Sequence, residues 1–168
     1  MWYFILFAVT LLIDQISKII VDANNFDITV IEGFLNIDNE YNPGASFSFL
    51  AGVSWAQTFF IVLTAVVLVA GVIFVLVAKM DSKWLKSSIA LLFSGTIGNF
   101  IDRIAFSYVR DFIDVPFFAN FNIADCCLVI GSIMLIFYVL FLDKDPVFKV
   151  FKNKDNQTID VEDSVNND

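Results

Sequence analysis

The chain consists of long apolar runs separated by shorter polar segments. Four predominantly apolar segments each approach the roughly 20 residues that a helix needs to cross about 30 Å of hydrocarbon at about 1.5 Å per residue. They cover approximately residues 1–21, 59–78, 85–104 and 123–142. The pattern therefore predicts an all-α membrane protein with four transmembrane helices. The first segment has no basic leader and no small-residue cleavage site, so we expect a retained span and not a signal peptide.

The connection of residues 22–58 is too long for a simple turn and predicts a small β-containing cap on the extracytoplasmic surface. Its segment 28–31 is β-branched, which favours an extended strand. Residues 42–45 (NPGA) are a strong turn signal. Trp55 is expected to anchor the cap at the membrane interface.

Composition excludes a soluble domain, and the placement of charge predicts an orientation. Of the 168 residues, 58% are hydrophobic, and the mean hydropathy is +0.78, which is more apolar material than a soluble domain buries. The net charge is −8, but Lys residues gather in the connection 79–86 and in the tail, whereas residues 22–58 contain no Lys or Arg. Because basic residues mark the cytoplasmic side, both termini are predicted inside. We expect one domain over residues 1–152, a disordered cytoplasmic tail over 153–168, and no nucleic-acid partner.

The polar residues of the spans share one membrane depth. With both termini inside, the ends of the first and third spans and the start of the fourth lie in the outer leaflet. Asp14 and Lys18 are four residues apart and can pair on one helical face. An ionisable side chain in the membrane is costly and is a functional-site candidate by default. The converging residues are Asp14, Lys18, Asn42, Asn99, Asp102, Arg103, Asp111, Asn122 and Asp125.

Asp111 and Asp125 are the predicted catalytic pair. Asp111 follows the third apolar run and Asp125 precedes the uncharged run 126–142, so both lie at the same end of two spans. The chain contains no His, so paired carboxylates point to acid–base chemistry run by the carboxylates themselves. We expect no metal, because no His ligand exists and the adjacent Cys126 and Cys127 are interpreted as apolar filler.

Structural interpretations of these polar residues stay open at this point. Asp14 and Lys18 form, in one alternative, an ion pair that only holds helices in register. Arg103 either extends to lipid headgroups or pairs with Asp102. Asp125 is also well placed to cap the N-terminus of its helix.

Three further residues have competing interpretations. Gly95 and Gly98 are small and favour close helix packing over chemistry. Asp114 is either a rival of Asp111 for the catalytic role or a solvated loop charge.

Five motifs follow one another along the chain in a specific order. They are residues 14–18 (DQISK), 42–48 (NPGASFS), 95–103 (GTIGNFIDR), 111–113 (DFI) and 121–125 (FNIAD). Each motif is weak to moderate alone, but the ordered set with four spans is highly specific. Over approximately residues 1–142 the sequence resembles the bacterial lipoprotein signal peptidase family, also called signal peptidase II.

This resemblance implies an aspartyl endopeptidase of the bacterial cytoplasmic (inner) membrane, with its active site at the extracytoplasmic face. Such enzymes cleave diacylglyceryl-modified prolipoproteins before the lipidated cysteine. Asp111 and Asp125 would share one proton and activate water, without a cofactor. The implied partners are the prolipoprotein substrates and membrane lipid, with the acyl chains in an apolar groove between spans, and we expect a monomer. The residues implied to bind substrate or support the site are Asp14, Lys18, Asn42, Gly44, Asn99, Asp102, Arg103 and Asn122.

Three features depart from the family pattern. Arg110 stands before Asp111, where the family usually has an apolar residue, and this cation is expected to lower the pKa of the Asp111 carboxyl. Ser46 stands where Ala is common. The stretch between the two aspartates is shorter than in familiar members, so we expect a different loop over the site.

Two other functions are alternatives to the peptidase dyad. In a Ser/Lys peptidase, Ser46 or Ser48 would attack with Lys18 as base, but this leaves the clustered carboxylates unexplained. In a small transporter or channel, ions would pass Asp14, Lys18 and Asp102. Such a path needs polar groups at every depth, and the polar residues do not continue inward along the second and fourth spans.

Overall fold

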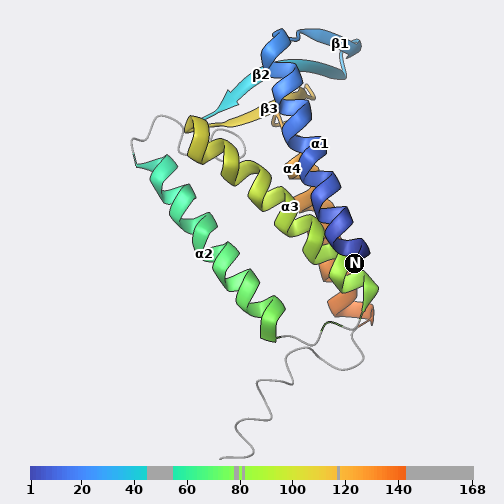
Figure 1. Ribbon diagram of the computed structural model, residues 1–168. Helices are drawn as coiled ribbons and strands as arrows, with labels where there is room; N and C mark the ends of the chain where they lie inside the picture. The colour runs from blue at the N-terminus through green and yellow to red at the C-terminus, as the bar shows by residue number, and fades with distance from the viewer. Residues whose placement is uncertain (45–54, 78–79, 81, 117, 143–168) are drawn as a thin grey trace, which may run out of the picture.

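Four long helices carry the predicted membrane spans in the computed structural model, which describes residues 1–44, 55–77, 80, 82–116 and 118–142 (Figure 1). Helix α1 covers Trp2–Asn24, α2 Ala56–Val77, α3 Lys83–Phe106 and α4 Ile123–Phe137, which continues as the π-helical segment η2, Tyr138–Leu142. In the described part of the chain all four are long and apolar enough to cross a membrane. The predicted four-span class is confirmed, with each end placed within about one turn.

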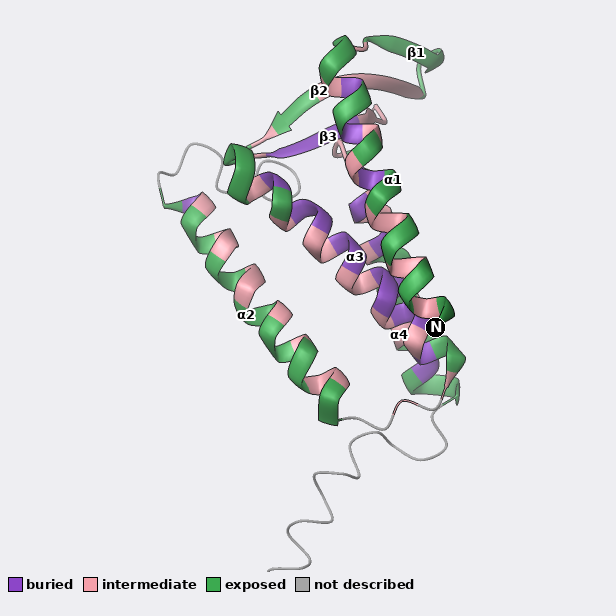
Figure 2. Ribbon diagram, in the orientation of Figure 1, coloured by how far each residue is buried: buried purple, intermediate pink, exposed green. Residues whose placement is uncertain are grey.

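Helix α3 lies at the centre of the bundle. Its most apolar window has a mean hydropathy of 1.3, the lowest of the four, and is also the most buried at 39%. The buried face of α3 packs against α1 and α4 (Figure 2). Polar groups in a membrane have to be covered by protein or water, which explains why the most polar helix is the central one.

Helix α2 is the opposite case. Its mean hydropathy is 3.2 and none of its apolar window is buried. It packs mainly against α3 and stands apart from α1 (Figure 1). A helix that is apolar on every side is suited to lipid contact.

Small residues let the central helices approach closely, as predicted for Gly95 and Gly98. A Cβ on Gly95 would collide with the carbonyl oxygen of Ala124 on α4. A Cβ on Gly98 would lie 2.6 Å from Oδ2 of Asp14 on α1. The packing interpretation of both glycines is confirmed, and Gly98 also contributes to the site because it makes room for the Asp14 carboxylate.

The cap is a three-stranded antiparallel sheet with the order β1-β2-β3. Strand β1 covers Ile28–Ile31 and β2 covers Leu35–Asn42, joined by a turn in which Gly33 has φ of 71°. The extended segment 28–31 is therefore confirmed. Strand β3, Val109–Asp114, was not predicted; it comes from the connection between α3 and α4 and pairs with β2.

Some sequence predictions lie outside the described residues. These are the end of the 42–45 turn, the loop with Ser46 and Ser48, and the tail 153–168. Trp55 lies exposed next to the start of α2, and its anchoring role at the interface stays a prediction.

We expect Gly95→Ala to lower the unfolding midpoint by several degrees, because the new methyl group meets backbone atoms of α4 that cannot move aside. Overpacking of this kind costs about 1–3 kcal/mol. Gly71→Ala is the matched control, because the three atoms nearest to its Cβ would all belong to the ring of Phe93, which can rotate away. Thermal unfolding of both variants in one detergent measures the difference. Equal shifts would contradict the close contact of α3 with α4.

Candidate active site

The structure brings Asp111 and Asp125 to one cavity, as the sequence predicted. Asp111 lies in β3 and is 3% exposed, and Asp125 lies half-buried in the first turn of α4. Asn122 contacts both carboxylates: its Nδ2 donates to Oδ1 of Asp111 at 2.7 Å, and its backbone N–H donates to Oδ2 of Asp125 at 3.1 Å. One residue therefore joins the predicted pair.

Two further asparagines donate hydrogen bonds to the carboxylates of Asp111 and Asp125. Asn42 Nδ2 donates to Oδ2 of Asp111 at 3.0 Å, and Asn99 Nδ2 donates to Oδ1 of Asp125 at 2.8 Å. Asn42 reaches Asp111 because β2 and β3 pair with Asn42 opposite Val109, which makes Asn42 and Asp111 diagonal neighbours on one face of the sheet. Each oxygen of the two carboxylates thus accepts a hydrogen bond from an asparagine.

Asp125 also caps its helix. The side chain of Asn122 accepts from the backbone N–H of Asp125 at 2.9 Å, and the Asp125 side chain accepts from the backbone of Asn122. This reciprocal pattern is a capping box. The capping interpretation of Asp125 is confirmed and is compatible with a place in the cavity, because only one of its oxygens is used for the cap.

A buried ion cluster lies next to the Asp111–Asp125 pair. Lys18 Nζ is 2.9 Å from Oδ2 of Asp14 and 3.3 Å from Oδ2 of Asp102, and it donates to Oδ1 of Asn99 at 3.0 Å. The three charged residues are each at most 1% exposed. Oδ1 of Asp14 accepts from the backbone N–H of Ala124 at 2.8 Å. The Asp14–Lys18 pair thus joins α1 to α3 and to the start of α4. Asn99, which contacts both Lys18 and Asp125, connects the ion cluster to the site.

Asp102 does not pair with Arg103, and that alternative was wrong. Asp102 accepts instead from Arg110, whose Nη2 lies 2.7 Å from Oδ1. Arg103 donates through Nη2 to the carbonyl oxygen of Gly44 at 3.3 Å and lies over the ring of Phe60. Its Nε is buried and has no acceptor among the described residues. Arg103 therefore faces the cavity with one donor unused.

Asp114 is separate from the site. It accepts from Nδ2 of Asn36 at 2.8 Å at the far end of β3 and does not line the cavity. Cys126 lines the cavity and Cys127 is buried, and both are free. Among the described residues no group of three or more His, Cys, Asp or Glu side chains is placed to hold a metal.

The cavity has a volume of about 650 Å³, which is within the usual range for sites that bind small ligands or short peptides. Its polar side includes both carboxylates, and its other walls are apolar side chains of α4 and of the connection before it. It is lined by Asn42, Thr64, Thr96, Asn99, Arg103, Val109, Asp111, Phe118, Ala119, Asn120, Phe121, Asp125, Cys126, Leu128, Val129 and Ile130.

The pKa of the Asp111 carboxyl is raised to about 7. Burial is the largest cause, and the negative charge of Asp125 adds to it; hydrogen bonds from Asn42 and Asn122 and the charge of Lys18 act in the opposite direction. The expectation that Arg110 lowers this pKa was wrong, because neighbouring strand residues point to opposite faces and the guanidinium contacts Asp102. A carboxyl with a pKa near neutrality can hold or release a proton during a reaction.

Sequence reasoning missed two residues around the site. Gln15 Nε2 donates to Oδ2 of Asp14 at 3.0 Å and to the carbonyl oxygen of Gly98 at 3.1 Å. Its position beside a buried carboxylate, within the first motif, was the available signal. The sequence identifies Arg110 only as a neighbour of Asp111, and the spacing carries no signal of its contact with Asp102.

Four helices long and apolar enough to cross a membrane, together with two aspartates that line one cavity, define an integral membrane protein with a candidate carboxylate site. The chain belongs to the signal peptidase II family of proteases, because residues 6–141 match the family described as signal peptidase (SPase) II. The family resemblance seen in the sequence is confirmed.

Similar proteins support this assignment along most of the chain. Proteins named lipoprotein signal peptidase are 40% identical over 144 residues in Staphylococcus aureus, covering 81% of this chain and 86% of the relative. The relative from Moorella thermoacetica is 35% identical over 141 residues, covering 82% and 92%. A solved bacterial membrane enzyme matches with a TM-score of 0.73 at 35% identity, covering 85% of this chain and 89% of that one. The chain is thus similar to bacterial membrane proteases that act on lipoproteins.

We expect the stability of the fold to fall as the pH rises from about 4 to about 7. The folded protein keeps the Asp111 proton up to a pH near 7, whereas the unfolded chain releases it near 4. In that window the folded state binds more protons, so raising the pH disfavours it. Thermal unfolding across the window should show the wild type losing stability relative to Asp111→Asn. Parallel curves for the two proteins would contradict the raised pKa.

Proposed function

We propose that this chain is an aspartyl endopeptidase that cleaves diacylglyceryl-modified prolipoproteins on the N-terminal side of the lipidated cysteine. Membership of the signal peptidase II family supports signal-peptide cleavage of lipoproteins. The observation that supports a catalytic pair most directly is that Asn122 contacts both Asp111 and Asp125. Two carboxylates that line one cavity can act as paired acid and base.

In the proposed reaction the two carboxyl groups hold one proton between them, because like charges at short range cannot both stay ionised. The ionised carboxylate takes a proton from a water molecule, whose oxygen attacks the peptide carbonyl carbon. The protonated partner donates its proton to the carbonyl oxygen. The tetrahedral intermediate then collapses: the carboxyl group that took the water proton gives it to the leaving nitrogen, the C–N bond breaks, and the other carboxylate takes a proton from a hydroxyl of the intermediate, which restores the singly protonated pair. The products are the carboxyl end of the signal peptide and the free amine of the lipidated cysteine.

The residues around the dyad have distinct proposed roles. Asn42, Asn99 and Asn122 orient the carboxylates by direct hydrogen bonds. Arg103 supplies its unused Nε as a donor for a carbonyl oxygen of the substrate backbone, and its contact with Gly44 fixes it there. We propose a monomer as the working unit.

Lys18 is not the base of a Ser/Lys peptidase in this proposal. Its Nζ has three acceptors, Asp14, Asp102 and Asn99, which matches the three N–H donors of an ammonium group. A cation held in this way has no free electron pair to accept a proton from a serine. The ion cluster supports the dyad and has no direct part in bond cleavage.

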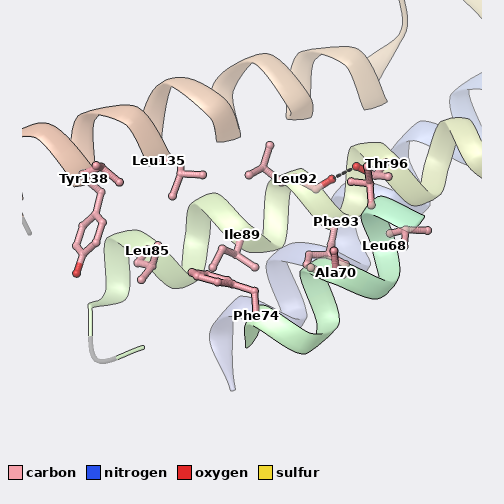
Figure 3. A pocket seen from close by; sticks show the side chains of 13 residues that line it. Leu68, Ala70, Phe74, Leu85, Ile89, Leu92, Phe93, Thr96, Leu135 and Tyr138 are labelled. Atoms are coloured by element: carbon pink, nitrogen blue, oxygen red, sulfur yellow. Dashed lines mark hydrogen bonds between the residues drawn. The ribbon is translucent and has the colours of Figure 1, made fainter. Parts of the chain in front are cut away.

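The substrate's acyl chains are proposed to enter a second cavity, which is apolar and has a volume of about 410 Å³. Side chains of α2, α3 and α4 line it, among them Leu68, Leu92 and Leu135 (Figure 3). Thr96 lines this cavity and also the cavity of the dyad, so the two adjoin. A lipidated cysteine bound at the dyad can therefore extend its chains between the helices without leaving an apolar environment.

The proposed orientation follows from the positive-inside rule. Lys83 and Lys86 lie at the start of α3, and the dyad lies at the opposite end of the same helix, next to Arg103. We propose that the lysines face the cytoplasm and that the dyad lies at the extracytoplasmic face. A lipoprotein precursor exported through the membrane presents its cleavage site at that face.

We expect Asp111→Asn and Asp125→Asn each to lower turnover of a diacylglyceryl-modified precursor by at least about 100-fold, because each removes one half of the acid–base pair. Purified protein in detergent and lipid, with gel separation of precursor and product, measures this. The wild type should leave the same precursor intact when it carries no lipid.

Asp114→Asn is the matched control, because the same change is made three residues along β3 and outside the cavity. It should keep most activity, as should Ser46→Ala and Ser48→Ala. Undiminished cleavage by Asp125→Asn would reject the dyad, and loss of activity in Ser46→Ala or Ser48→Ala alone would favour the Ser/Lys peptidase.

We expect Leu68→Trp to raise KM for the lipidated precursor several-fold with little change in kcat, because the indole fills space that the acyl chains need. Leu12→Trp is the control: Leu12 is 57% exposed on α1 and lines none of the described cavities. Steady-state kinetics with precursors of two acyl lengths measure the effect. An unchanged KM in Leu68→Trp would move the acyl chains away from this cavity.

A further inference from the structure

Arg110 is buried directly beside the proposed dyad, but it faces away from the cavity. It is 6% exposed and does not line the cavity, although Val109 and Asp111 on either side do. Its guanidinium lies over the ring of Phe106 at 4.6 Å and reaches the Asp102 carboxylate. A buried cation at this position has a specific partner and no contact with the space for substrate.

The contact between Arg110 and Asp102 has three points. Nη2 donates to Oδ1 at 2.7 Å, and Nε and the backbone N–H both donate to Oδ2, at 3.4 and 3.0 Å. The chain turns between these two residues at Ser107, which ends α3 with φ of 64°. One carboxylate therefore fixes both the side chain and the backbone of Arg110 against the end of α3.

This fixation continues into the site. The carbonyl oxygen of Arg110 accepts from Asn122 Nδ2 at 3.4 Å, and the same Nδ2 donates to Asp111 at 2.7 Å. Asp111 is the next residue of β3, so its backbone starts from the peptide group that Asp102 and Asn122 hold. A shift of Arg110 would move the Asp111 carboxyl relative to Asp125.

Charge balance requires Arg110 as well. Asp14 and Asp102 carry two negative charges, and Lys18 alone supplies one positive charge to them. Arg110 supplies the second. Without it the buried cluster has an unpaired carboxylate, which would turn toward Lys18 and leave the backbone N–H of Arg110 without its acceptor.

We propose that Arg110 is a positioning residue: its three-point contact with Asp102 sets the start of β3 so that the Asp111 carboxyl meets Asp125. The inference rests on the proposed function, because it assumes that Asp111 is one half of the dyad. Arg110 has no contact with substrate in this role. Its effect is on turnover, and substrate affinity is set by other residues.

The test compares Arg110→Leu with the wild type in the cleavage assay on a diacylglyceryl-modified precursor. We expect kcat to fall about ten- to hundredfold, since a displacement of about 1 Å at a reacting group is enough for that, while KM stays within about twofold. Lys83→Leu, at the opposite and exposed end of α3, removes the same charge outside the site and should leave both constants unchanged. An unchanged kcat in Arg110→Leu, or a rise in KM alone, would overturn the proposal.

Two further variants separate positioning from a general loss of folding. Arg110→Lys keeps the charge but lacks the planar pair of donors, so its kcat should lie between those of Arg110→Leu and the wild type. Asp102→Asn with Arg110→Leu removes both partners and leaves no lone charge, so it folds even if the single variant does not. The kcat of this double variant should be no lower than that of Arg110→Leu alone or of Asp102→Asn alone, whichever is lower. Equal kcat in the Lys and Leu variants, or additive losses in the double variant, would overturn the proposal.

Asp111→Asn in the same assay distinguishes failure of the positioning role of Arg110 from failure of the dyad. Inactive Asp111→Asn together with a normal Arg110→Leu rejects only the positioning role. Active Asp111→Asn rejects the dyad, and the role of Arg110 with it.

Discussion

A charge buried among apolar helices has to be paired, and the pairing of Lys18 is the interaction on which the rest of this structure depends. Its ammonium group is surrounded by Asp14 of its own helix and by Asn99 and Asp102 of α3. An unpaired ammonium here would cost several kcal/mol by any scale. Because all three donors are satisfied, the network is rigid and specifies one arrangement of α1 and α3. The proposed dyad is connected to this network through Asn99, which donates to Asp125.

The proposed dyad is held by neutral amides and not by cations. Asn42, Asn99 and Asn122 all donate to its oxygens, while Lys18 and Arg110 contact other carboxylates. An amide donor orients a carboxylate, whereas a directly bound cation would fix it in the ionised form. Because Lys18 and Arg110 do not contact the dyad directly, the two carboxyl groups can hold a proton. This arrangement agrees with the raised pKa of the Asp111 carboxyl.

The sequence predicts the parts of this fold that depend on local periodicity. Hydropathy is sufficient for the four spans, and the four-residue spacing is sufficient for the Asp14–Lys18 pair. Local periodicity is not sufficient for β3, a short strand whose partner lies far away along the chain. The pairing of Asp102 with Arg103 was wrong because adjacent residues of a helix do not face each other, and the true partner Arg110 lies beyond the end of that helix.

The most direct test of this account is the position of ordered water between the two aspartates in a high-resolution crystal structure. If the two aspartates activate one water, that water should lie within about 2.6–3.2 Å of an oxygen of Asp111 and of an oxygen of Asp125. A water bound to only one of them, or a side chain lodged between the two carboxyl groups, would contradict it.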